Sequence, residues 1–410
     1  MNIPKLRFKE FTDEWQIKKL DKNTYIKARV GWKNLKASEY VSSGIPMIAG
    51  QHIKQGKILW DKVDFITNER YDESPEIQLK NNDIIFSKDG SLGNPAIIKN
   101  MPKKATINGT MMLIRLNYIN DNVSPNYFYQ ICNSQYFKKM VSLIKSGGTV
   151  PHIFQRDIIN FTFPIPKTLE EQEKIANFLS IVDKKVENLK NTITSLENQK
   201  KGLLQQIFSQ KLRFKDENGN NYPNWEKKKL GDICKFTGGG TPSTSILKYW
   251  NGTIPWISSS DLQTNTIHKI KISRYITNEA VSNSSTKIIP KNSILIVSRV
   301  GVGKVAISNC VLCTSQDFTN ITEINGNTTF YAYLLKYKME QLTQNTQGTS
   351  IKGITTSDIK NIKLIVPIEQ TEQTKIADFL SAFDRKLDNQ KAQLEHWQQI
   401  KKGLLQQMFV

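Results

Sequence analysis

Few segments of this chain combine residue types and spacings that could carry chemistry, and the first is the glycine-lysine sequence Gly301–Lys304, GVGK. A nucleotide-binding P-loop follows the pattern GxxxxGK[ST], because consecutive backbone amides must surround the phosphates and a hydroxyl must follow the lysine. Ser298 stands where the upstream glycine is required, and Val305 follows the lysine. The segment therefore does not predict a nucleotide site.

Cysteine and histidine spacing gives no metal motif. Cys310 and Cys313 form the only CxxC, and a zinc site usually needs a second close pair. The surrounding sequence AISNCVLCT is typical of a buried strand, so we predict structural cysteines, with a metal or redox role as the alternative. The four histidines are scattered and match no HExxH or paired-histidine motif: His52, His152, His268 and His396.

Methyltransferase and nuclease motifs are also missing. An amino-methyltransferase needs a glycine-rich cofactor loop and an Asn/Asp-Pro-Pro-aromatic tetrapeptide, which Asn94-Pro95-Ala96 fails to match. A nuclease needs clustered carboxylates to hold Mg²⁺, whereas the ExK-like sequence at Glu226 belongs to a basic run of surface type. We expect neither a catalytic site nor a metal or cofactor bound by the chain itself. The alternative is a nuclease or methyltransferase complete in one chain.

The remaining candidates are polar and basic residues on loops. Sequence readout in a DNA major groove uses Arg, Lys, Asn, Gln, Ser and Asp, and Lys and Arg also bind phosphates. In the first half the candidates are Gln51, His52, Lys54, Ser87, Lys88, Ser91, Ser146 and Thr149. In the second half they are Ser258, Ser259, Ser260, Asp261, Ser298, Arg299, Lys304, Thr349 and Lys352. Each alone also fits a solvated loop, but together they predict a DNA-binding surface.

The net charge agrees with a polyanionic partner. The 410 residues include 57 Lys and Arg against 37 Asp and Glu, a formal charge of +20. Such a field attracts DNA, RNA or an anionic membrane alike. No segment approaches the roughly 20 consecutive apolar residues that span a bilayer, and MNIPKLRFKEF lacks the apolar region of a signal peptide. We therefore expect a cytoplasmic protein.

An internal repeat organises these candidates. EQEKIANFLSIVDKKVENLK begins at Glu171, EQTKIADFLSAFDRKLDNQK begins at Glu372, and each continues without a gap into KKGLLQQ. The surrounding frame repeats more loosely, as in IPMI at Ile45 and IPWI at Ile254, while residues 50–80 and 258–285 do not match. Shared frames with individual middles predict two domains that read different targets, and drift after duplication is the alternative.

The order of the repeats indicates where the chain ends meet. The first helical repeat runs directly into QKLRF at Gln210, whereas its counterpart PKLRF stands at Pro4, near the N-terminus. We infer that the two ends of the chain meet in space and close a pseudo-twofold ring.

Heptad spacing predicts a coiled coil in both repeats. The apolar positions of the first are Ile175, Leu179, Val182, Val186, Leu189, Ile193, Leu196, Leu203 and Ile207, with a gap at Lys200. Those of the second are Ile376, Leu380, Phe383, Leu387, Leu394, Trp397, Leu404 and Met408, with Gln390 and Lys401 as polar exceptions. Helices over about 170–208 and 371–409 would be roughly 55–60 Å long and would pair antiparallel. Their polar outer faces suit either an internal brace or partner subunits.

The two halves read as mixed α/β domains, so the predicted fold class is α+β, with two such domains joined by two long antiparallel coiled-coil helices. LKNNDIIFSKDG at Leu79 and PKNSILIVSRVG at Pro290 predict buried strands that run into turns. The segments that begin at Asn126 and Thr329 predict amphipathic helices.

The whole pattern resembles the specificity subunits of type I restriction-modification systems. A variable domain, a glycine loop of the form S/T-x-G-x, a proline-bearing loop and EQxxIAxFLS before a long helix occur twice. The resemblance implies target recognition domains at 1–165 and 211–366 and conserved helices at 166–210 and 367–410. Each domain would read one half of a bipartite, asymmetric site in double-stranded DNA.

The resemblance also implies partners. The helices would act as a spacer and dock two modification subunits, which bind S-adenosylmethionine and methylate adenine. Restriction subunits would add an ATP- and Mg-dependent translocase and nuclease. The family's spacer region can carry short tandem repeats, and none occurs between Lys190 and Lys200. A stand-alone DNA-binding regulator with a dimerisation coil is the alternative.

Overall fold

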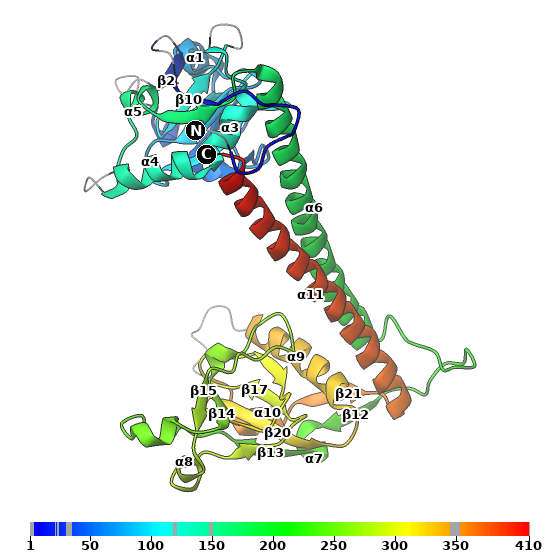
Figure 1. Ribbon diagram of the computed structural model, residues 1–410. Helices are drawn as coiled ribbons and strands as arrows, with labels where there is room; N and C mark the ends of the chain where they lie inside the picture. The colour runs from blue at the N-terminus through cyan, green and yellow to red at the C-terminus, as the bar shows by residue number, and fades with distance from the viewer. Residues whose placement is uncertain are drawn as a thin grey trace. The chain divides into compact units, whose positions relative to one another are not determined.

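Two long helices run through the chain, α6 (Leu169–Phe208) and α11 (Gln370–Gln407). The computed structural model describes residues 4–20, 22, 24–29, 35–117, 121–146, 151–344 and 353–409. The chain divides into two units, the first formed by Met1–Lys190 with Gln393–Val410 and the second by Asn191–Ala392. Each unit holds one mixed α/β domain and part of both long helices (Figure 1).

The first domain contains two larger sheets and two strand pairs. An antiparallel sheet has the order β2–β10–β7–β8 (Tyr25–Ala28, Met111–Arg115, Ile84–Ser87, Gly93–Ile97). A mixed sheet has the order β6–β3–β9 (Asp64–Ile66, Ile45–Ile48, Thr106–Ile107). The pairs are β1–β11 (Gln16–Lys19, Thr162–Ile165) and β4–β5 (Ile53–Lys54, Lys57–Ile58). The helices are α1 (Asn68–Asp72), α3 (Pro125–Asn133), α4 (Gln135–Ser146) and α5 (Gln155–Ile159).

The second domain repeats this frame. Its antiparallel sheet has the order β13–β20–β17–β18 (Cys234–Gly238, Phe318–Ile324, Ile294–Val297, Val305–Ile307). Its mixed sheet has the order β15–β14–β19–β16 (Arg274–Ile276, Ile254–Ile257, Leu312–Thr314, Ile288–Ile289), and β12 (Glu226–Lys229) pairs with β21 (Lys363–Val366). The helices are α7 (Leu230–Ile233), α8 (Asn278–Ser282), α9 (Thr328–Gln344) and α10 (Thr356–Lys360).

The strands β7 and β17 are almost entirely apolar because both of their faces are covered. Side chains alternate across a strand, so Phe86 of β7 joins the core beneath α3, α4 and α6, while Ile85 joins the core shared with the mixed sheet. In the second domain Ile296 and Leu295 of β17 divide in the same way between two cores. The predicted buried strands in both halves are confirmed.

The long helices pair antiparallel within each unit. In the first unit Met408, directly after the end of α11, packs in one core with Leu179, near the start of α6. In the second unit Ile207, from the end of α6, packs with Leu380, near the start of α11. The predicted heptad positions from Ile175 to Leu196 are all buried. In the last turns, Leu204 and Leu405 are buried, whereas the predicted Leu203 and Leu404 are half-buried.

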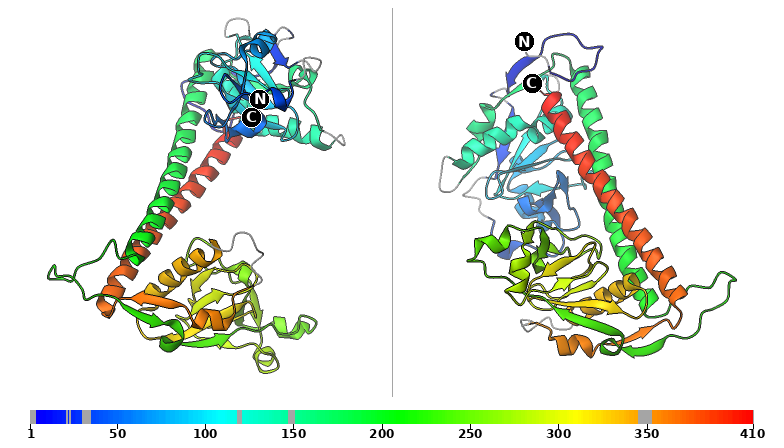
Figure 2. Two further views of the ribbon diagram at one scale, coloured as in Figure 1. Left: turned by 180° about the vertical axis from the view of Figure 1, so that it is seen from behind. Right: turned by 60° about the horizontal axis from the view of Figure 1, so that its bottom comes forward.

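The ends of the chain meet as predicted. In the first unit the backbone N–H of Leu6 donates to the carbonyl of Gln407 at 2.9 Å. Its equivalent in the second unit is the bond from Leu212 to the carbonyl of Gln206 at 3.0 Å, although there the chain is continuous. The first described residues therefore continue α11 as residues 209–214 continue α6, and the end of α11 lies beside the N-terminal segment in both views of Figure 2.

A buried glutamate at the start of each long helix fixes this closure. Glu171 accepts from Arg7 Nε at 2.8 Å and from Trp15 Nε1 at 3.0 Å. In the second unit Glu372 accepts from Arg213 Nε at 2.8 Å and from the Trp225 indole at 3.1 Å. Both carboxylates are almost fully buried, and charge-assisted bonds of this kind compensate for lost hydration.

The buried strand expected around the cysteines forms only at Cys313, since Cys310 is half-buried in the bend between β18 and β19. Cys313 is buried in β19, and burial raises the pKa of its thiol to about 11. Among the residues that the structure describes, no group of His, Cys, Asp or Glu is arranged to hold a metal ion. None of the described helices combines the length and apolar character that a membrane-spanning helix requires.

Candidate nucleic-acid interface

A short 3₁₀ turn follows the equivalent strands β3 and β14, and its last residue closes it in both halves. In the turn Gly50–His52 the His52 Nδ1 accepts from the backbone N–H of Ala49 at 3.0 Å. In the turn Ser259–Asp261 the Asp261 Oδ2 accepts from the N–H of Ser258 at 2.8 Å. His52 is only 3% exposed and Asp261 only 8%. These two candidate readers therefore stabilise the turns, which present the exposed side chains of Gln51 and Ser260.

Arg274 binds the second turn from the neighbouring strand β15 and adds a basic side chain beside it. The sequence alone did not identify Arg274 as a candidate. Its Nη2 donates to Ser258 Oγ at 2.7 Å and forms an ion pair with Asp261. The guanidinium lies 4.6 Å from the ring centroid of Trp256, its partner in the register between β14 and β15. With 38% of its side chain exposed, Arg274 retains donors that can reach a ligand. Only the pairing of β15 with β14 reveals this position.

In each domain the turn after β3 or β14 lies against the loop after β7 or β17, although the two are far apart in the sequence. In the first half, a side chain at Gly50 would collide with Ser87 Oγ, so the turn lies directly against the end of β7. In the second half, Lys304 Nζ donates to the carbonyl of Ser259 at 2.9 Å. The turn after β3 or β14 and the loop after β7 or β17 therefore form one surface in each domain.

The glycine loops end beside the same surface. The N–H of Ile153 donates to the carbonyl of Lys88 at 3.0 Å, and the N–H of Ile354 donates to the carbonyl of Ser298 at 2.7 Å. Ser146 is the last residue of α4. Three of the predicted residues lie outside the described part of the chain: Thr149, Thr349 and Lys352.

Exposure separates the candidates whose side chains the structure describes into three groups. Those exposed to solvent are Gln51, Lys54, Ser91, Ser260 and Arg299. Those half-buried are Lys88, Ser258 and Lys304. Those buried are His52, Ser87, Ser259, Asp261 and Ser298. The buried hydroxyls are used internally, since Ser298 Oγ donates to the carbonyl of Asp317 at 3.0 Å. The exposed group is the one accessible to an anionic or polar ligand, although Ser260 Oγ also bonds Ser258 Oγ at 2.9 Å and Gln51 Nε2 lies 3.2 Å from His52 Nε2.

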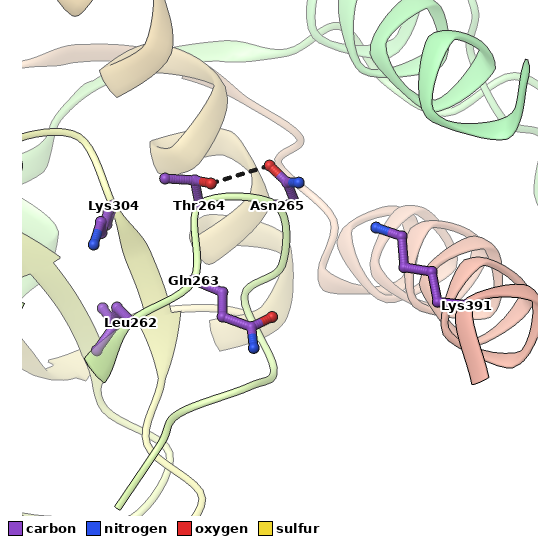
Figure 3. A pocket seen from close by; sticks show the side chains of 6 residues that line it. All are labelled: Leu262, Gln263, Thr264, Asn265, Lys304 and Lys391. Atoms are coloured by element: carbon purple, nitrogen blue, oxygen red, sulfur yellow. Dashed lines mark hydrogen bonds between the residues drawn. The ribbon is translucent and has the colours of Figure 1, made fainter. Parts of the chain in front are cut away.

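A hollow adjoins the second turn and faces α11 (Figure 3). Its volume is ≈ 370 Å³, and its lining residues are Leu262, Gln263, Thr264, Asn265, Lys304 and Lys391. Two ammonium groups and two side-chain amides line it; Lys304 Nζ also donates to the carbonyl of Ser259, and Lys391 Nζ lies 2.7 Å from Glu197 Oε1. Such a hollow suits anionic oxygens, as in a phosphate backbone.

Most of the coiled-coil stripe of α6 is buried within the chain, whereas a stand-alone regulator would need such a stripe for dimerisation. Within each unit the apolar residues of α6 and α11 cover one another, as Ile175 with Leu405 and Leu204 with Ile376. The ends of both apolar stripes are therefore covered inside the chain, while Phe383, Leu394 and Trp397 of α11 are half-buried.

One known protein family matches the chain at two separate ranges of the sequence. The family described as "Type I restriction modification DNA specificity domain" matches residues 13–198 and again residues 222–396. The MjaIX specificity subunit of Methanocaldococcus jannaschii is 36% identical over 208 residues, which are 50% of this chain and 48% of that protein. The chain thus spans about half the length of that relative in the match.

Longer matches cover nearly the whole chain. The putative MjaX specificity subunit of the same organism is 25% identical over 419 residues, 98% of this chain and 95% of that protein. Among solved structures, the S subunit of a type I restriction-modification system from M. genitalium shares the fold, with a TM-score of 0.63 and 18% identity over 100% of this chain and 99% of that one. Because the family matches both halves and together they make up most of the sequence, this chain belongs to the family of type I restriction modification DNA specificity domains.

Proposed function

We propose that this chain is the DNA-sequence specificity subunit of a type I restriction-modification complex, and that each domain reads one half of a bipartite, asymmetric site. One observation carries the proposal. Two equivalent frames hold the same 3₁₀ turn, yet one presents Gln51 and the other Ser260 beside Arg274. Since different donors and acceptors recognise different base edges, equal frames with unequal side chains would read unequal half-sites.

The charge distribution suits this role. Arg299 is exposed on the loop after β17, and Lys304 and Lys391 line the hollow beside the second turn. Lysine and arginine side chains that neutralise phosphates supply sequence-independent affinity, and base-edge contacts then specify the sequence. The net charge of +20 agrees with a polyanionic ligand, as DNA is.

In this proposal the chain has no catalytic step of its own. Two modification subunits would bind S-adenosylmethionine and methylate adenine, and restriction subunits would supply the ATP- and Mg-dependent nuclease. The outer faces of α6 and α11 would dock these partners, since their inner stripes are occupied.

Sequencing of DNA methylation tests the proposal directly. The full chain would be expressed with the modification subunits of its own system in cells that lack other adenine methyltransferases. We expect one methylated bipartite motif, with two different half-sites and a fixed gap. Methylation of a single continuous motif, or methyl transfer by the purified chain alone, would contradict the proposed division of labour.

A further inference from the structure

Each long helix carries two carboxylates one turn apart on the face toward its domain. They are Asp183 and Glu187 on α6 and Asp384 and Asp388 on α11, and residues four apart share one face of a helix. The repeat places Asp183 opposite Asp384 and Glu187 opposite Asp388 in the alignment. The residues that bind these carboxylates indicate the role of each of the two positions.

The first carboxylate of each pair joins the other long helix to the domain. In the second unit Asp384 forms a buried ion pair with Lys200 and accepts from Tyr333 Oη of α9 at 2.7 Å. In the first unit Asp183 pairs with Lys401 at 2.5 Å and accepts from Gln130 Nε2 of α3 at 3.3 Å. This contact belongs to the shared frame, because the equivalent helices supply the partner in both halves.

The second carboxylate reaches the part of the domain that is not shared. Lys269 Nζ lies 2.7 Å from Asp388 Oδ1, and Lys269 belongs to the loop that lines the hollow of Figure 3. The same loop is held to α9, since Lys336 Nζ donates to the carbonyl of Thr264 at 2.5 Å and His268 Nε2 lies 3.1 Å from Tyr333 Oη.

The first domain reaches the equivalent position with a different structure. The segment there is the β4–β5 hairpin, whose tip Gln55-Gly56 has positive φ angles of 56° and 80°. Lys57 at its base forms an ion pair with Glu187, and Gln55 accepts from Lys190 of the same helix. A side chain at Gly56 would collide with the Tyr129 hydroxyl, so only glycine lets the hairpin approach the domain helix this closely.

Two segments without sequence similarity thus place a lysine on the same helix position. We infer that Lys57–Glu187 and Lys269–Asp388 are positioning contacts that fix the orientation of each variable segment on the helix pair, and so set the separation of half-sites that the protein accepts. The inference rests on the proposed function in one respect, that these domains read DNA. It assigns to these lysines a contact with the helix and not with a base.

Reversing the charges of Lys269 and Asp388 distinguishes a positioning contact with the helix from a contact with a DNA base. The Lys269 side chain is 49% exposed and that of Asp388 38%, and ion pairs so exposed add little to folding, so Lys269→Glu and Asp388→Lys should both fold. The matched control is Lys235→Glu, which reverses a lysine paired with Glu323 at 2.7 Å on the surface of β13 and β20.

Each full-length variant would be assembled with its modification subunits and titrated with duplexes that carry both half-sites and spacers varied one base pair at a time. For Lys269→Glu and for Asp388→Lys we expect selectivity for the native spacer to fall about two- to fivefold, with base preferences at both half-sites unchanged. The Lys269→Glu/Asp388→Lys exchange should restore the selectivity, and Lys235→Glu should not alter it.

Three results would overturn the inference: unchanged spacer selectivity in both single variants, no recovery in the exchange, or an altered base preference at the second half-site. The last would make Lys269 a reader of DNA. If the unaltered complex shows no bipartite preference at all, the proposed function itself fails, and this inference with it.

Discussion

At the scale of single residues, the same position in the two domains holds different chemistry with the same local role. His52 and Asp261 both close a 3₁₀ turn with a side-chain acceptor. From sequence alone they were indistinguishable from readers such as Gln51 and Ser260, because all are polar residues after the same apolar strand. The difference lies in burial and in the bond to Ala49 or Ser258, which depend on the folded turn.

Arg299 offers the most direct test of base or phosphate contact in the second domain. It is exposed on the loop after β17, which also carries Lys304. We predict that Arg299→Ala weakens binding to the complete site by about 1–3 kcal/mol and leaves the first half-site's base preference unchanged. Competition binding with duplexes altered in one half-site measures this. A changed preference at the first half-site would contradict independent reading by two domains.

Lys336 predicts a pH dependence of stability in the second unit. Burial, assisted by the charge of Lys200, lowers the pKa of its ammonium to about 8, from an ordinary 10.5. Between these pH values the unfolded chain binds the proton and the folded chain does not, so stability increases with pH there. We expect a gain of about 1–2 kcal/mol from pH 8 to 9.5, which Lys336→Met should abolish. Urea unfolding at several pH values measures it, and an equal rise in both proteins would exclude Lys336 as the source.

At the scale of elements, the long helices were the most predictable part of the fold. A 4-3 apolar spacing over five turns has few interpretations, and α6 begins at Leu169 and ends at Phe208, close to the predicted bounds. The gap at Lys200 could not be interpreted, because its partner Asp384 lies on the other helix. The variable segments are not predictable either, since a short β-hairpin in one domain and a longer loop closed by a single bridge between Leu262 and Ile270 in the other reach the same helix position.

The equivalent ion pairs Lys200–Asp384 and Lys401–Asp183 are predicted to contribute differently to the free energy of unfolding. Lys200 and Asp384 are 8% and 5% exposed, whereas the equivalent Lys401 and Asp183 are 28% and 29% exposed. Removal of one partner from a buried pair leaves an uncompensated charge, so Lys200→Ala should cost about 3 kcal/mol of unfolding free energy. Lys401→Ala, its matched control, should cost about 1 kcal/mol or less. Equal losses in chemical denaturation would show that burial does not separate the two pairs.

At the scale of the whole molecule, the two units share the same structural frame but present different side chains on their turns and variable segments. The glutamates at Glu171 and Glu372, the closing contacts of Leu6 and Leu212, and the carboxylate pairs on both long helices recur in each unit. The residues that differ are those presented by the turns and variable segments. A duplicated frame therefore permits either domain to change what it reads while its support stays the same.

Because α6 and α11 are continuous, we predict that their length sets the number of base pairs between the two half-sites. Deletion of the equivalent heptads 191–197 and 392–398 keeps the apolar order and leaves Asp183, Glu187, Asp384 and Asp388 in place, while shortening each helix by about 10 Å. Since one base pair rises about 3.4 Å, the methylated motif should keep both half-sites and lose about two to three base pairs of its gap. Deletion of 191–197 alone is the control, because it mismatches the two helices and should abolish assembly. If the double deletion assembles and methylates the original spacing, the helices do not set the distance between half-sites.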